Sequence, residues 1–243
     1  MRDYKLELEK RVAFIQNLLK SSGAKGIVFG NSGGKDSALV GILCKKACEN
    51  TIGIIMPCES ARNFGEDKDD GLDVAKQFDI DTRTVDLTDA KRAVIDAVKD
   101  KTTLNNQALT NIAPRLRMIT VYAVAAAENL IVAGTGNRSE RYMGYFTKYG
   151  DGGCDFNPIA DLTVGEVYEF LTFLNAPENI IKKAPSAGLF EGQTDEAEMG
   201  VTYAAIDKYV LTGQANEHDK KIIDRYHSRS EYKRKMPAVY KEV

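Results

Sequence analysis

The sequence predicts an α/β fold in which a Rossmann-like parallel sheet is covered by helices on both faces. Four short apolar segments alternate with longer stretches whose apolar residues recur at helical spacing. Two of the apolar segments, 26–30 and 130–134, end in glycine and lead into further glycine-rich, polar sequence. Ligands bind parallel sheets beyond the carboxyl ends of the strands, near a change in strand order. The two glycine-rich segments are therefore the first candidates for a binding site.

The first half of the chain alternates regularly between helix and strand. Residues 4–21 are typical of an amphipathic helix, and Gly23 offers a stop. The apolar segments that follow are short, and Pro57 ends one of them. In chain order, the further expected elements are strand 26–30, helix 36–49, strand 51–56, helix 66–79, strand 82–87, helices 88–100 and 115–129, and strand 130–134.

The pattern changes after Glu140. Residues 144–153 carry four glycines and are expected to form a loop, whereas residues 163–174 return to a helical pattern. Residues 183–198 combine a proline, glycines and acids, and we expect a mobile loop there. Two more helices and a basic tail complete the chain. Since no repeat or linker interrupts the sequence, we expect a single domain over residues 1–243.

The composition argues against several classes of protein. A formal net charge of -2 over 243 residues does not favour a nucleic-acid binder. The N-terminus is charged throughout, and no stretch approaches the roughly 18 apolar residues of a membrane helix, so we expect no membrane association. The four cysteines form no Cys-x-x-Cys pair and only two histidines accompany them, which argues against zinc. This cysteine usage is typical of a reducing compartment, and we expect a cytoplasmic protein.

Residues 30–37, Gly-Asn-Ser-Gly-Gly-Lys-Asp-Ser, carry the clearest chemical signal. Glycines let the backbone approach a ligand, and the amides that begin a helix attract anions. Ser32 and Ser37 add hydroxyl donors. The segment is not a Walker A loop, because Asp36 and not a hydroxyl residue follows Lys35, and the Gly-x-Gly-x-x-Gly dinucleotide spacing is absent. The structural alternative is a glycine-rich turn with a polar cap.

Asp36 changes the electrostatics of an anion-binding loop. A carboxylate that faced a phosphate directly would repel it. A Mg²⁺ ion between the two groups removes the conflict, since this ion is bound by carboxylate and phosphate oxygens together. The sequence therefore predicts magnesium at the loop.

The segment Ser32–Ser37 resembles the Ser-Gly-Gly-x-Asp-Ser loop of the ATP pyrophosphatases. The resemblance implies a sheet of the adenine nucleotide α-hydrolase type. It also implies an enzyme that splits ATP between the α and β phosphates, with the loop around pyrophosphate and the substrate converted to an adenylate. This motif says little about the substrate.

A second region narrows the resemblance. Residues 134–140 lead from a Gly-Thr strand end to Glu140, and residues 146–153 read Phe-Thr-Lys-Tyr-Gly-Asp-Gly-Gly. Both are similar to the signature of the NAD synthetases. Residues 113–118 look like that family's Ala-Arg-x-Arg-Met region, displaced by a proline, and residues 185–200 resemble its later Pro-Thr-Ala…Asp-Glu loop.

The resemblance covers about residues 10–238 and implies a role for individual positions. The implied ATP-binding residues are Gly30, Asn31, Ser32, Gly33, Gly34, Lys35, Asp36, Ser37, Thr135 and Ser186. The implied metal ligands are Asp36 and Glu140, and the implied residues for the deamido-NAD substrate are Arg115, Lys148, Asp155, Tyr232 and Lys233. Taken singly, each charge has an ordinary structural explanation, but their occurrence together and in order favours the functional one.

Two positions depart from the family pattern. Val164 stands where the family usually has a lysine that is expected to reach ATP. Tyr232 stands where the family has the histidine of a His-Lys pair, although Lys233 keeps the second member. Tyrosine can donate a hydrogen bond but cannot carry a positive charge.

The implied reaction has two steps. The carboxylate of deamido-NAD attacks ATP to give an adenylate and pyrophosphate, and ammonia then releases AMP and forms NAD. The resemblance further implies a homodimer. We expect free ammonia and not glutamine to be the nitrogen donor, because the similarity fills nearly the whole chain and leaves no room for a glutaminase domain.

Two other functions compete with this one. The first is adenylation of an RNA or a purine nucleotide by an enzyme of the same superfamily, to which the basic residues at 225–235 could contribute. The second is a nucleotide-binding regulatory module without turnover. Two metal-binding carboxylates argue against a regulatory module, and pyrophosphate release would distinguish it from an enzyme.

Overall fold

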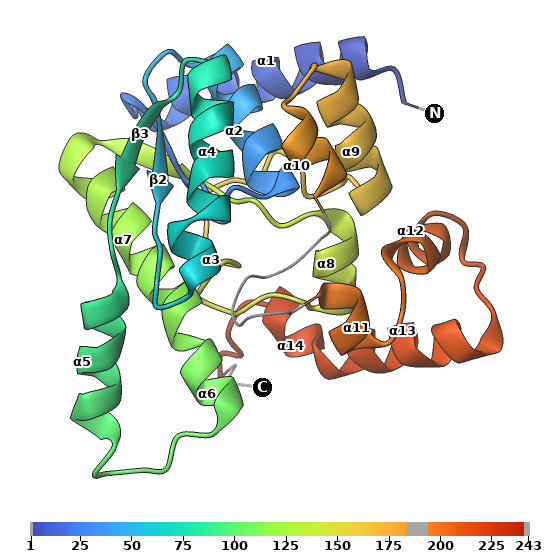
Figure 1. The fold of residues 1–243 in the computed structure, drawn as a ribbon. Helices are drawn as coiled ribbons and strands as arrows, with labels where there is room; N and C mark the ends of the chain where they lie inside the picture. Colours follow the sequence, from blue (N-terminus) through green and yellow to red (C-terminus); the bar gives the residue numbers. More distant parts are fainter. Residues whose placement is uncertain (1, 184–193, 241–243) are drawn as a thin grey trace.

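The computed structural model describes residues 2–183 and 194–240. At its centre lies a four-stranded parallel sheet in the order β3-β2-β1-β4 (Figure 1). The strands are β1 (Gly26–Gly30), β2 (Thr51–Ile55), β3 (Asp81–Thr84) and β4 (Leu130–Ala133). The order changes direction between β1 and β4, since the chain builds outward to β3 on one side and then returns to pair β4 with β1. The predicted parallel α/β fold is confirmed.

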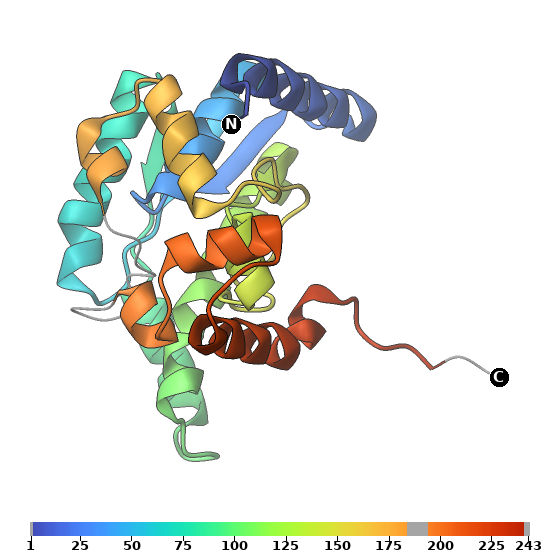
Figure 2. The same ribbon diagram turned by 90° about the vertical axis from the view of Figure 1, so that its right-hand side faces the viewer.

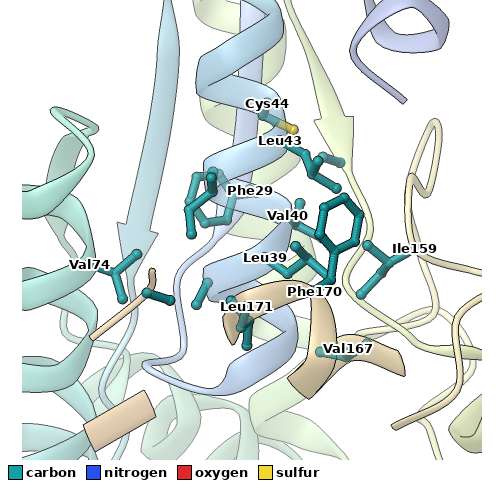
Figure 3. Packing of buried hydrophobic residues seen from close by; sticks show 14 of the residues in the cluster. Phe29, Leu39, Val40, Leu43, Cys44, Val74, Ile159, Val167, Phe170 and Leu171 are labelled. Carbon is teal, nitrogen blue, oxygen red and sulfur yellow. The ribbon is translucent and has the colours of Figure 1, made fainter. Parts of the chain in front are cut away.

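Helices cover both faces of the sheet. The bounds of the longer helices around it are α1 (Tyr4–Ser22), α2 (Lys35–Ala47), α4 (Glu66–Gln77), α5 (Thr88–Val98), α7 (Ile112–Glu128) and α9 (Val164–Phe173). Alternate residues of β1 serve the two faces, because successive side chains of a strand point to opposite sides. Ile27 and Phe29 pack with α1, α2, α4 and α9, whereas Val28 packs with α7. Figure 3 shows Phe29 beside α2 and Phe170 of α9 on the first of these faces.

A third apolar cluster holds the C-terminal helices against the rest of the molecule (Figure 2). These helices are α11 (Asp195–Met199), α12 (Tyr203–Thr212) and α13 (Glu217–Arg229), and α13 is followed by the short α14 (Glu231–Arg234). Met143, Val164 and Ile223 are among the buried residues of this cluster, so it joins the end of helix 138–143 to α9 and α13. The cluster lies beyond the carboxyl end of β4, where the sequence predicts a binding site.

The short helices are the main difference from the elements expected above. The structure adds α3 (Ala61–Phe64), α6 (Asn106–Thr110), α8 (Arg138–Met143) and α10 (Glu178–Lys182). A helix of one or two turns contains too few residues to show a periodic apolar pattern, so the sequence gives little sign of it. The expected loop 183–198 is helical at α11, and its residues 184–193 lie outside the described part of the chain. Within the described ranges, every helix is too short or too polar to span a bilayer.

Candidate active site

The glycine-rich loop between β1 and α2 folds around its serines and glycines. Gly33 has φ +69°, and a Cβ there would lie 2.0 Å from the carbonyl oxygen of Asp67, so this position requires glycine. Ser37 Oγ donates to the Gly34 carbonyl over 3.0 Å and lies 3.1 Å from Ser32 Oγ. Gly34 is the N-cap of α2 and has no side-chain oxygen with which to cap the first amides. These amides are therefore suited to a bound anion.

A cavity of about 1000 Å³ opens beside this loop. That volume lies at the upper end of the range for small-molecule sites. The sequence-predicted residues in its wall are Gly30, Asn31, Ser32, Gly34, Lys35, Asp36, Ser37, Arg115, Thr135, Glu140, Lys148, Tyr232 and Lys233. Fold topology thus brings to one cavity residues as distant in the chain as Gly30 and Lys233. Ser186 lies outside the described residues.

The two predicted metal ligands come together at the junction of β1 and β4. Asn137 caps α8 through a reciprocal pair of bonds with Glu140, in which each side chain accepts from the backbone of the other. The Asn137 amide also donates to Asp36 Oδ1 over 3.1 Å. One asparagine therefore links both carboxylates. An Asn-x-x-Glu capping pattern is visible in the sequence, but the contact with Asp36 is not.

Lys35 supplies the positive charge beside these carboxylates. Its Nζ lies 2.7 Å from Asp36 Oδ2 and 5.9 and 5.7 Å from the ring centroids of Tyr168 and Tyr203. Burial alone would lower the pKa of Lys35, but the charges of Asp36 and Glu140 outweigh it and raise that pKa. Burial and the charge of Asp36 raise the pKa of Glu140 well above its usual value, and Lys35 opposes this shift. The lysine amine thus faces the carboxylates and not open solvent.

This donor set fits a magnesium ion. Mg²⁺ is commonly held by one or two protein carboxylates together with substrate phosphates and waters. Asp36 and Glu140 provide two such carboxylates next to the amides that suit a phosphate. In the described part of the chain no three His, Cys, Asp or Glu side chains form a cluster that could hold a metal by themselves. The residues present therefore suit a metal that arrives with a nucleotide.

The loop 144–153 and α14 form the far wall of the cavity. Lys233 Nζ donates to the carbonyls of Gly144 and Phe146 over 2.8 and 2.7 Å. Lys148 Nζ donates to the carbonyls of Tyr232 and Lys235, over 2.6 and 3.2 Å. Both predicted substrate lysines line the cavity while they hold the loop and the C-terminal segment together.

Of two further residues predicted to bind the substrate, Arg115 lines the cavity and Asp155 does not. Arg115 is exposed at the cavity wall near the start of α7. Asp155 does not line the cavity: its Oδ2 accepts from the Val132 amide over 2.8 Å, and its Oδ1 accepts from the Tyr122 hydroxyl over 3.0 Å. In this structure Asp155 fastens the loop to β4, and its role with substrate stays a prediction.

Val164, one of the two departures from the family pattern, is buried in the structure. Its side chain is 4% exposed and packs with Met143 and Tyr203 in the third apolar cluster. Position 164 therefore belongs to the apolar core in this chain and does not line the cavity.

Several cavity residues had no sequence signal. Arg62, Asp67 and Lys183 form a charged wall beside the glycine loop. Arg225 and Arg229 of α13, which the sequence shows only as part of a basic segment, also line the cavity. The run of acids that contains Asp67 has the composition of an ordinary solvent-exposed helix face. Only the packing of α4 against the loop turns one side of it toward the cavity.

Comparison with known proteins identifies the family of the chain. Residues 7–242 match the family model described as NAD synthase. The chain belongs to the NAD synthase family. It is 46% identical to the NH(3)-dependent NAD(+) synthetase of Carboxydothermus hydrogenoformans over 234 residues, which cover 95% of each chain.

Solved structures of NAD synthase relatives show the same fold. The NMN synthetase of Francisella tularensis has a TM-score of 0.93 and 37% sequence identity, with 99% of each chain covered. The NH3-dependent NAD synthetase of Campylobacter jejuni has a TM-score of 0.79 and 31% identity, with 99% of this chain and 100% of that chain covered. Family and fold are thus shown over nearly the full length.

Proposed function

We propose that this chain is an ammonia-dependent NAD synthetase, a ligase that uses ATP to convert deamido-NAD into NAD, AMP and pyrophosphate. The observation that carries the proposal is that one cavity is lined by three features: the glycine-rich loop 30–37, called the anion loop from here on, the Asp36–Glu140 pair and the 144–153 loop. The 46% identity to an NH(3)-dependent NAD(+) synthetase supports the assignment of substrate and nitrogen donor.

The proposed reaction forms two bonds and breaks two, and ammonia also gives up one N–H proton. An oxygen of the nicotinate carboxylate bonds to the α phosphorus of ATP, and the bond from that phosphorus to the β-phosphate oxygen breaks. Ammonia then bonds to the acyl carbon and loses a proton, and the bond from that carbon to the AMP oxygen breaks. A carboxylate by itself is a poor acyl donor because oxide would have to leave. The adenylate provides a better leaving group.

The protein contributes positioning and charge stabilisation. The open amides at the start of α2 and the hydroxyls of Ser32 and Ser37 suit the pyrophosphate part of ATP. Asp36 and Glu140 would hold Mg²⁺, which when bound neutralises charge on the phosphates. Lys35 keeps these carboxylates together by compensating part of their charge.

The dinucleotide is expected on the opposite wall. Arg115, Lys148 and Lys233 place positive groups there, and Tyr232 offers a ring and a hydroxyl. We also propose that Thr135 and Ser186 contact ATP and that residues 1–243 act as one domain. The proposed assembly is a homodimer in the cytoplasm, on the grounds of family resemblance and cysteine usage.

A second candidate is NMN formation by the same chemistry on the corresponding mononucleotide. It is favoured by one observation, since the NMN synthetase of Francisella tularensis has a TM-score of 0.93 with this chain, whereas the NAD synthetase of Campylobacter jejuni has one of 0.79. Both reactions adenylate the same nicotinate carboxylate. They differ only in whether the cavity also receives the AMP half of the substrate.

One experiment tests both candidates. The purified chain is incubated with ATP, Mg²⁺ and ammonium, and with either deamido-NAD or nicotinate mononucleotide, and kcat/KM is measured for each. A preference for the dinucleotide, with AMP and NAD formed in equal amounts, supports the main proposal. A preference for the mononucleotide replaces it with the second candidate, and absence of AMP with both would overturn the two together. Glutamine in place of ammonium, with contaminating ammonia controlled, tests the nitrogen donor.

A further inference from the structure

Lys183 follows α10 directly, and its ammonium group lies between two segments that are distant in sequence. Nζ is 2.5 Å from Asp70 Oδ2, 2.8 Å from Asp67 Oδ1 and 3.3 Å from the carbonyl oxygen of Gly33. All three ammonium protons therefore have an acceptor. The side chains of Lys183, Asp67 and Asp70 are only 11%, 13% and 10% exposed, so the ion pairs are largely shielded from water.

The two carboxylates are fixed by further donors. Asp67 Oδ2 accepts from the Asn63 amide over 2.8 Å, and Asp70 Oδ1 accepts from the Asn179 amide over 2.6 Å. Lys183 is held at its backbone as well, since its carbonyl accepts from the Tyr168 hydroxyl over 2.7 Å. The position of the ammonium group is thus fixed by its three acceptors and by the hydrogen bond to its own backbone carbonyl.

The bond from Lys183 to Gly33 has a consequence for the next residue. The carbonyl of Gly33 and the N–H of Gly34 belong to one planar trans peptide, in which they point in opposite directions. A cation that fixes the carbonyl also fixes the direction of the N–H. That N–H donates toward Ser32 Oγ over 3.3 Å, and both Gly34 and Ser32 line the cavity.

The loop also lies directly on α4. A Cβ at Gly33 would lie 2.0 Å from the Asp67 carbonyl oxygen, and the Asn31 amide donates to the Gly71 carbonyl over 2.9 Å. These contacts set the distance between loop and helix. Lys183 adds the charged contact, because it binds the loop and two carboxylates of α4 at once.

We propose that Lys183 is a positioning residue of the loop 30–37: it holds the Gly33–Gly34 peptide, and through the Gly34 N–H also the Ser32 hydroxyl, in the conformation in which the loop binds pyrophosphate. The inference rests on the proposed function in one respect, that the loop 30–37 binds the pyrophosphate part of ATP. All three hydrogen bonds of the Lys183 ammonium group go to protein acceptors, so its proposed role requires no contact with the nucleotide.

The test is the binding of inorganic pyrophosphate with Mg²⁺, measured by calorimetry on the full chain. Lys183→Met is expected to weaken binding by about tenfold to a hundredfold, since small displacements of positioned groups cost factors of this size. Lys182→Met is the matched control. It removes the same charge one residue earlier, from a side chain that is 75% exposed and paired with Glu178 on its own helix, and its affinity should stay within about twofold of the unaltered chain.

A double variant separates position from charge. Lys183→Met combined with Asp70→Asn keeps the net charge of the unaltered chain but removes the ion pair. Positioning predicts that pyrophosphate affinity stays low, whereas recovery to the unaltered value would mean that Lys183 acts only by its charge and would overturn the proposal. Lys183→Arg keeps the cation and should retain more affinity than Lys183→Met, which provides a readout even if the methionine variant folds poorly.

The remaining outcomes are also distinct. If the unaltered chain binds pyrophosphate and Lys183→Met binds it equally well while only its melting temperature falls, Lys183 is merely structural and the inference fails. If the unaltered chain does not bind pyrophosphate at all, the loop assignment in the proposed function falls, and the inference falls with it.

Discussion

At the scale of single residues, Asp36 and Glu140 form one site although they follow different strands. Asn137 bridges them, and Lys35 compensates part of their negative charge. Two carboxylates in a partly buried site repel each other and lower the stability of the folded chain, and a bound cation would offset this repulsion. The pair is therefore expected to destabilise the metal-free chain and to favour binding of a metal.

Asp36→Asn and Glu140→Ala are each expected to reduce pyrophosphate release by on the order of a hundredfold or more. Each substitution removes a carboxylate that would hold the metal, and Asp36→Asn keeps the size of the side chain. Steady-state release of pyrophosphate is the measurement, and circular dichroism checks that the fold is kept. Turnover close to normal in either variant would rule out the metal assignment.

The raised pKa of Glu140, caused first by burial and then by Asp36, has a consequence for stability. Between the ordinary pKa of an unfolded glutamate and the raised value in the folded state, the folded chain binds a proton that the unfolded chain has lost. The free energy of unfolding therefore falls as pH rises through this window.

Glu140→Gln cannot ionise, so without a metal this variant should be more stable than the unaltered chain above that window and equally stable below it. Chelator-treated protein melted over a range of pH tests this. Glu9→Gln, at an exposed position of α1, controls for the loss of one negative charge. Equal pH profiles for Glu140→Gln and the unaltered chain would contradict the prediction.

At the scale of elements, the 144–153 loop is shaped by its contact with the C-terminal helices. Gly144 ends α8 with φ +69°, and a Cβ there would lie 2.0 Å from Ser230 Cβ. Ser230 in turn donates to the Met143 carbonyl over 3.2 Å, and Lys233 donates to the Gly144 carbonyl. The 144–153 loop and the C-terminal segment thus form one unit.

Gly144→Ala is compared with Gly213→Ala, where φ is +73° but nothing lies within 4 Å of the added Cβ. Both variants lose about 1–2 kcal/mol from the left-handed backbone. Gly144→Ala should lose a further 1–3 kcal/mol, roughly, because the new atom overlaps Ser230. Urea unfolding measures the difference, and KM for the dinucleotide should rise only for Gly144→Ala. Equal losses of stability would show that the contact with Ser230 relaxes freely.

At the scale of the whole molecule, an ion-pair network joins the N-terminal segment, including α1, to the start of α9 and the residues before it. Arg11 donates to both oxygens of Asp161 over 2.7 and 2.8 Å, and Arg2 donates to Asp161 and Glu166 over 3.0 and 2.8 Å. Burial alone would raise the pKa of Asp161, but the guanidinium of Arg11, with a smaller contribution from Arg2, outweighs it and lowers that pKa.

A lowered carboxyl pKa in the folded state stabilises the chain above the unfolded pKa of aspartate, and this stability is lost as pH falls through the folded value. Asp161→Asn should therefore be less stable than the unaltered chain at neutral pH, with the difference shrinking in acid. Urea unfolding at several pH values measures it. Asp89→Asn, whose side chain is 98% exposed, is the control. A difference that did not change with pH would mean that the network contributes through shape and not through charge.

Much of the architecture follows from patterns within the sequence. The start of α1, the end of that helix at Gly23 and the whole of β1 agree closely with the expected bounds. The anion loop was recognisable for the same reason, since its glycines, serines and Asp36 are consecutive. Local periodicity and short motifs carry such information because neighbouring residues produce it.

The tertiary structure alone decided which distant residues share the cavity. The contact of Asn137 with Asp36, the bond from Lys183 to the glycine loop and the placement of Asp155 away from the cavity each depend on how separate helices and strands pack. The sequence around a lysine or an aspartate does not show whether its side chain faces solvent, a carboxylate or a backbone carbonyl. The sequence by itself thus determined the sheet, the anion loop and the family, whereas packing determined which charges meet, because partners distant in the chain leave no periodic trace in it.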